Sequence, residues 1–245
     1  MTRTTNARIA GFTFLAYIVV TIASESVLGH AASGASAAAQ LASMSEHVAG
    51  MYVVIFLALA QAFAAIILAV TLYAITREQN RDLAIFAMMC RVVEGVRNGF
   101  VASTYVALLW IAIATVPGTP ATGALQVLGE FLLGTNGDTI TGIFFAVGNA
   151  LFAWLLLRGR VIPAALGWLG VASSIILLVG LPAELVTSLP IWAQWLMFLP
   201  ALAYEIPLGF WLLIKGVGTS QPRGPGRNIP RQHPTNPDEG RSTAA

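Results

Sequence analysis

The chain has 245 residues, of which 57% are hydrophobic and only 10% are charged. An average soluble domain has about 25% charged residues, so this composition indicates a membrane protein. The formal net charge is only +2, and the basic residues are dispersed along the chain, which argues against nucleic acid as a partner. The single cysteine, Cys90, excludes an intrachain disulfide and a CxxC redox pair.

Six apolar segments are long enough to form transmembrane helices, because a helix crosses the hydrocarbon core with about 20 mostly apolar residues. The first segment follows Arg3 and Arg8, but its apolar stretch reaches the length limit of a secretory signal, so we expect it to be retained. We therefore predict an all-α, polytopic membrane bundle. The predicted helices span about residues 9–29, 48–75, 83–115, 139–157, 163–181 and 192–214.

The basic residues predict the orientation of these helices. Lys and Arg concentrate in the cytoplasmic loops of membrane proteins. Apart from Arg91 and Arg97, every Lys and Arg precedes the first helix, follows the sixth, or lies between the second and third or the fourth and fifth. We therefore expect both termini in the cytoplasm, in a multi-pass protein of the inner (plasma) membrane whose surroundings are the lipid bilayer.

The remaining segments are assigned from composition. The Ala/Ser-rich residues around 30–47 are expected to form an outer loop, and residues 124–133 a short interfacial helix. After a transmembrane domain of residues 1–217, residues 218–245 are rich in Pro, Gly and polar side chains. Such a segment cannot bury enough apolar surface to fold, so we predict a disordered cytoplasmic tail.

The third predicted helix carries a charged face within the sequence RVVEGVRNG. Each charge at the bilayer centre costs about 2.5–3.5 kcal/mol on insertion scales, so this face has to turn away from lipid. A second interpretation begins the span at Gly99 and leaves the charges at the cytoplasmic boundary. The apolar end of the preceding helix argues against it, because antiparallel pairing brings Ala64 level with Glu94. Helical spacing places four polar residues within one arc of about 120°: Arg91, Glu94, Arg97 and Asn98.

Other predicted helices carry polar residues at similar depth, which predicts a polar layer near the centre of the bilayer. Two arginines and two glutamates make this layer formally neutral, as charges buried together require. Gly95 and Gly99 form a GxxxG pattern beside it, which favours close packing against a neighbouring helix of the bundle. The candidate binding residues are Arg91, Glu94, Arg97, Asn98, Glu205, Gln61 and Asn149, with Ser173 and Ser174 at the same level.

Two functions fit this layer. Ionisable residues inside a membrane commonly mark binding sites and proton pathways, so the protein is predicted to bind or pass a small solute, a proton or a lipid headgroup. Alternatively, the buried charges only fix the helix register of a non-catalytic scaffold or interaction protein. In that case the basic tail contacts anionic lipid or a cytoplasmic protein partner. The two interpretations differ in whether the buried charges need a ligand.

The sequence contains no pattern of a known enzyme or metal site. There is no HExxH, GxSxG or intramembrane aspartate pair, and His30, His47 and His233 do not have metal-ligand spacing. We therefore expect no enzymatic activity, no catalytic residue, no metal and no cofactor.

Four segments together resemble one bacterial membrane family, catalogued as domain-of-unknown-function family 4386. They are RIAGFTFLAYIVV near the start, RVVEG in the third helix, LLLRGRVIPAALGWLG, and YEIPLGFWLLIKG at the end, and they extend over about residues 8–217. The resemblance implies a multi-helix bacterial membrane protein. Arg91, Glu94 and Glu205 fall on positions that look like the family pattern, but the resemblance brings no activity, substrate or catalytic residue.

Overall fold

The computed structural model describes residues 2–114, 120–134, 137–187 and 190–217, and the secondary structure in these residues is entirely helical. The all-α prediction is confirmed. Six segments are long and apolar enough to cross a membrane. Five of them are formed by α1, α3, α4, α7 and α8, and the sixth contains α6. The predicted tail lies outside the described residues. The helices are α1 (Arg3–Ala31), α2 (Ala37–Glu46), α3 (Val48–Thr76), α4 (Arg81–Ala114), α5 (Pro120–Gly134), α6 (Gly137–Arg158), α7 (Ala164–Val186) and α8 (Ile191–Ile214).

The prediction of a loop around residues 30–47 is wrong, because most of this segment forms α2. Its sequence AAAQLASMSE is rich in Ala, the strongest helix former, and the Ser36 hydroxyl caps it by accepting a hydrogen bond from the Ala39 N–H at 3.2 Å. The segment predicted as an interfacial helix lies within α5. α2 packs against α5 through Leu41, whose side chain fills the space above Gly129.

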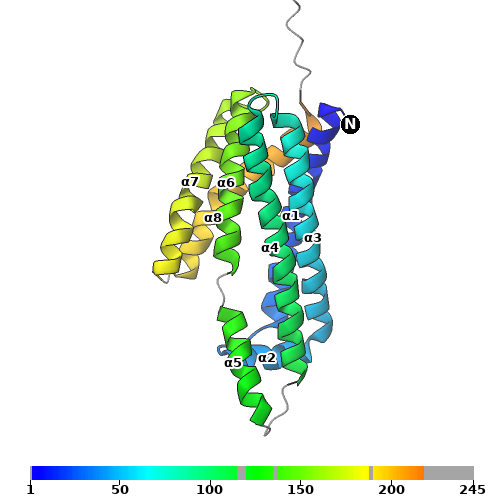
Figure 1. Cartoon of the computed structure of the whole chain (residues 1–245), viewed down its shortest axis with the longest axis vertical. Coiled ribbons are helices and arrows are strands. Elements are labelled where there is room, and N and C mark those ends of the chain that lie inside the picture. The colour runs from blue at the N-terminus through cyan, green and yellow to red at the C-terminus, as the bar shows by residue number, and fades with distance from the viewer. Residues whose placement is uncertain (1, 115–119, 135–136, 188–189, 218–245) are drawn as a thin grey trace, which may run out of the picture.

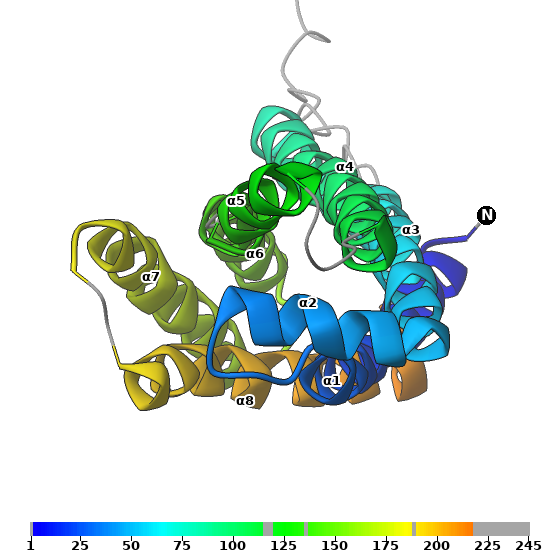
Figure 2. The ribbon, with the colours of Figure 1, turned by 90° about the horizontal axis from the view of Figure 1, so that it is seen from below.

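The six long helices form a closed ring (Figures 1 and 2). Going round it, α1 contacts α3, α3 contacts α4, α4 contacts α6, α6 contacts α7, α7 contacts α8, and α8 returns to α1. The start of α1 and the end of α8 lie at the same end of the bundle, which we call the terminal end (Figure 1). Polar contacts help to hold this end together: Thr4 donates a hydrogen bond to the Val217 carbonyl at 3.4 Å, and Arg3 pairs with Glu78 at 2.7 Å.

The buried apolar core changes along the bundle. At the terminal end one continuous cluster joins α1, α3, α4, α6 and α8, with Phe14, Leu72 and Phe152 among its members. At the opposite end, the described core residues fall into two clusters, one formed by α1 to α5 and one by α6 to α8. The polar layer lies at the level where the single cluster gives way to the two.

The contact between α3 and α4 is closest at Gly95. A Cβ atom built there would lie 2.9 Å from the Ala62 carbonyl oxygen and 2.9 Å from Ile66 Cγ1, which agrees with the antiparallel register expected from the sequence. A Cβ at Gly99 would have nothing within 4 Å. The packing role expected of the GxxxG pattern is therefore right for Gly95 and wrong for Gly99, since one turn further along α4 the space is open.

Replacing Gly95 with alanine should destabilise the protein by about 1–3 kcal/mol, because the added methyl group meets backbone that cannot move aside. Gly99→Ala is the matched control. It should leave stability unchanged or raise it by up to about 1 kcal/mol, because alanine is the better helix former. Thermal unfolding of the purified proteins in detergent measures both. Equal losses in the two variants would contradict the packing described here.

Candidate functional site

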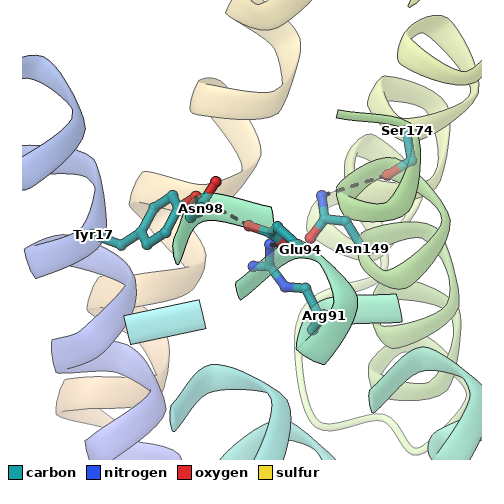
Figure 3. A network of polar contacts seen from close by, with 6 residues as sticks. All are labelled: Tyr17, Arg91, Glu94, Asn98, Asn149 and Ser174. Atoms are coloured by element: carbon teal, nitrogen blue, oxygen red, sulfur yellow. Dashed lines mark hydrogen bonds and ion pairs between the residues drawn. The ribbon is translucent and has the colours of Figure 1, made fainter. Parts of the chain in front are cut away.

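The centre of the bundle contains an ion pair formed within α4. Arg91 Nη1 donates a hydrogen bond to Glu94 Oε2 at 2.7 Å, across the i,i+3 spacing that places the two side chains on one face (Figure 3). Each residue exposes only 1% of its surface. The charged face of α4 is therefore turned into the bundle, away from the apolar outer surface.

Helix α1 completes the hydrogen bonding of Glu94. The Tyr17 hydroxyl donates to Glu94 Oε1 at 3.0 Å, and Asn98 Nδ2 donates to the Tyr17 hydroxyl at 3.3 Å (Figure 3). Both carboxylate oxygens of Glu94 thus accept hydrogen bonds. Tyr17 was not among the residues predicted from the sequence.

The guanidinium of Arg91 lies between two aromatic rings. Its Cζ atom is 4.9 Å from the ring centre of Phe145 on α6 and 5.7 Å from that of Phe14 on α1, which is within the range of cation–π attraction. Gly148 on α6 makes room for the arginine, because a Cβ there would lie 3.1 Å from Arg91 Cγ. The positive charge is therefore held by one carboxylate and two rings.

A second set of hydrogen bonds joins α6 to α7 beside this ion pair. Asn149 Nδ2 donates to the Ser174 hydroxyl at 3.4 Å (Figure 3). Ser173 and Ser174 in turn donate to the Gly170 carbonyl at 3.0 and 2.8 Å. All three polar side chains are buried. They contribute neutral groups, and no charge, to the polar layer.

Glu205 on α8 differs from Glu94 in its hydrogen bonding. It exposes only 5% of its surface, and its buried Oε1 atom has no hydrogen-bond partner among the described residues. Arg91 and Glu94 are the charged groups that act on it electrostatically, so it faces the same interior. The hydroxyl of the neighbouring Tyr204 is also buried without a hydrogen-bond partner in the described part of the chain. We call Tyr17, Arg91, Glu94, Asn98, Asn149, Tyr204 and Glu205 the central cluster.

Two of the predicted site residues take a different position. Gln61 on α3 is only partly buried and makes no hydrogen bond to the central cluster. Arg97, one turn beyond Glu94 on α4, is also partly exposed, although its Nε atom is buried. Among the described residues, the fully buried charges are one guanidinium and two carboxylates: Arg91, Glu94 and Glu205.

The described residues do not form a metal site. No set of three or more His, Cys, Asp or Glu side chains is arranged to hold a metal ion in the described part of the chain. Cys90, next to Arg91, is a buried free thiol. The side chains of the central cluster offer hydrogen-bonding groups, charges and exchangeable protons.

Comparison with known families gave one match. The profile of a family described as a domain of unknown function (DUF4386) matches residues 9–216, which include every residue of the central cluster. No curated protein and no solved structure matched the chain.

Proposed function

The chain belongs to the DUF4386 family, and from this premise we propose that it binds a small solute, a proton or a lipid headgroup at the central cluster, or passes it across the membrane. We place the protein in the inner (plasma) membrane with the terminal end in the cytoplasm. This orientation is supported by the basic residues Arg3, Arg77, Arg158 and Lys215, which all belong to the terminal end.

The observation that carries this proposal is the difference between the two buried glutamates. Both carboxylate oxygens of Glu94 accept hydrogen bonds, whereas the buried Oε1 atom of Glu205 accepts none from the described residues. Nearly all buried polar groups in folded proteins are hydrogen-bonded, because an unsatisfied buried group costs about 1–3 kcal/mol and a charged one more. An acceptor kept at this cost inside the bundle is a binding group for something that the protein itself does not supply.

A second candidate function is that of a membrane scaffold or interaction protein with purely structural buried charges. The ion pair of Arg91 and Glu94 supports it, because together with Tyr17 and the two aromatic rings this pair needs no ligand. Under this alternative the tail beyond residue 217 contacts anionic lipid or a cytoplasmic protein. The first candidate therefore requires Glu205 to bind a ligand, whereas the second gives it a purely structural role.

Thermal unfolding of two isosteric variants separates these candidates. Glu205→Gln should melt at the same temperature as the natural protein or higher, because no hydrogen bond to a described residue is lost at the buried Oε1 atom and a buried charge is removed. Glu94→Gln should be destabilised by about 3–5 kcal/mol, because it deprives the buried Arg91 of its hydrogen-bonded counterion. Glu130→Gln, on the exposed surface of α5, is the control and should not change the melting temperature.

These measurements are made on protein purified in detergent. If Glu205→Gln lost as much stability as Glu94→Gln, Glu205 would be part of the structural network and the binding role would be excluded.

A further inference from the structure

The buried charges of the central cluster do not balance. Arg91 is 2.7 Å from Glu94 and neutralises it, which leaves the carboxylate of Glu205 as the third fully buried charge of the described residues. An ionised carboxylate without a partner is very costly in a low-dielectric interior. The group that binds at Glu205 therefore brings a positive charge.

The groups that surround Glu205 do not supply this charge. Among the helices that contact α8, α1 places Tyr17 in the cluster and α7 places only the hydroxyls of Ser173 and Ser174 there. α6, on the far side of α7, adds the amide of Asn149. On α8 itself the adjacent titratable group is Tyr204.

Among the described residues, the charges that act on Glu205 lie on helix α4. These are Arg91 and Glu94, which are already paired with one another. No other described residue supplies a positive charge to Glu205.

The space around these groups selects the smallest cation. Arg91 and Glu94 expose 1% of their surfaces, Tyr204 exposes none (0%), and Glu205 exposes 5%. Water therefore barely reaches the cluster in this conformation. A hydrated metal ion or an organic ammonium group would need the helices to separate, whereas a proton needs no volume.

We propose that Glu205 is a proton-binding site and that the ligand of the central cluster is a proton. This inference rests on the proposed function and names its ligand. A hydronium ion transfers its proton to a carboxylate oxygen of Glu205, an O–H bond forms, and one water molecule is released. The product is a neutral carboxylic acid, which leaves Arg91 and Glu94 as a balanced pair. Release of the proton to water reverses the step.

Infrared spectroscopy of the protein in lipid nanodiscs tests the proposal, because a protonated carboxylic acid has a carbonyl stretching band that a carboxylate lacks. Spectra are recorded while the pH is raised in steps, in H2O and in D2O. The natural protein and the Glu130→Gln control should show a carboxylic acid band that disappears at high pH and shifts in D2O. Glu205→Gln should lose this band, and Glu205→Asp should keep a displaced one.

Two results would overturn the proposal. A natural protein without the band at any pH would mean that Glu205 stays ionised, and a band that persists in Glu205→Gln would place the proton on another group. Either result would leave the proposed binding function standing if Glu205→Gln still melts at or above the temperature of the natural protein. The failure of the proton as ligand is thus distinguishable from the failure of the site. Thermal unfolding of the same samples confirms that each variant is folded.

Discussion

Replacing Arg91 with methionine should prevent most of the protein from accumulating in a folded form. The variant keeps a side chain of similar length but leaves Glu94 as a fully buried carboxylate that has lost its counterion. Breaking a buried ion pair in this way costs about 3–5 kcal/mol, and the total stability of a folded protein is only about 5–15 kcal/mol. The measurements are the yield of monodisperse protein after extraction from the membrane and its melting temperature.

The double variant Arg91→Met with Glu94→Leu is the matched control. Removing both partners of a buried ion pair is often neutral or stabilising, because neither charge has to be taken out of water. The double variant should therefore recover most of the lost yield and melting temperature. If it were no better than Arg91→Met alone, loss of the counterion would not be the cause of the damage.

Replacing Gly11 with alanine should separate α1 from α8. A Cβ atom at this position would lie 2.5 Å from the Gly209 carbonyl oxygen and 2.5 Å from the backbone nitrogen of Leu213. Both atoms belong to the helical backbone of α8, so neither can rotate away as a side chain would. Overpacking of this kind typically costs about 1–3 kcal/mol and occasionally more. The melting temperature of the purified variant measures the effect.

Gly29→Ala is the control for this prediction, because it makes the same change in the same helix where nothing lies within 4 Å of the added atom. It should melt at the temperature of the natural protein or slightly above it. A Gly11→Ala protein as stable as Gly29→Ala would show that α1 and α8 do not pack as closely as described.

Much of the fold could be predicted from the sequence because the membrane restricts the alternatives. A spanning helix needs a long apolar run, and Lys and Arg mark one side of the bilayer, so six spans follow from composition alone. α2 could not be predicted in this way. Its Ala- and Ser-rich sequence is not apolar enough to span, and the decision between loop and helix depended on alanine propensity and the Ser36 cap.

The interior face of α4 could also be predicted, because the cost of charge in lipid leaves Arg91 and Glu94 only one direction in which to point. The same argument could not find Phe14, Tyr17 and Phe145. An aromatic residue in an apolar helix is equally stable against lipid and against the bundle interior, so only the arrangement of helices around the ring decides.

The position of Gln61 shows a related limit of sequence analysis. The sequence indicates how deep a residue lies in the membrane, but the direction of an uncharged side chain depends on helix rotation. Gln61 on α3 is only partly buried and makes no hydrogen bond to the central cluster, although its predicted depth in the membrane is similar to that of the cluster.

The contact between the first and the last helix sets an order for biosynthesis. Chains are made from the N-terminus, so α1 and α4 are synthesised before α8. Tyr17, Arg91 and Glu94 can then satisfy one another early. Glu205 arrives only when α8 closes the ring against α1. The hydrogen-bonded residues of α1 and α4 are therefore made first, and the carboxylate of Glu205 becomes buried last, when α8 packs against α1.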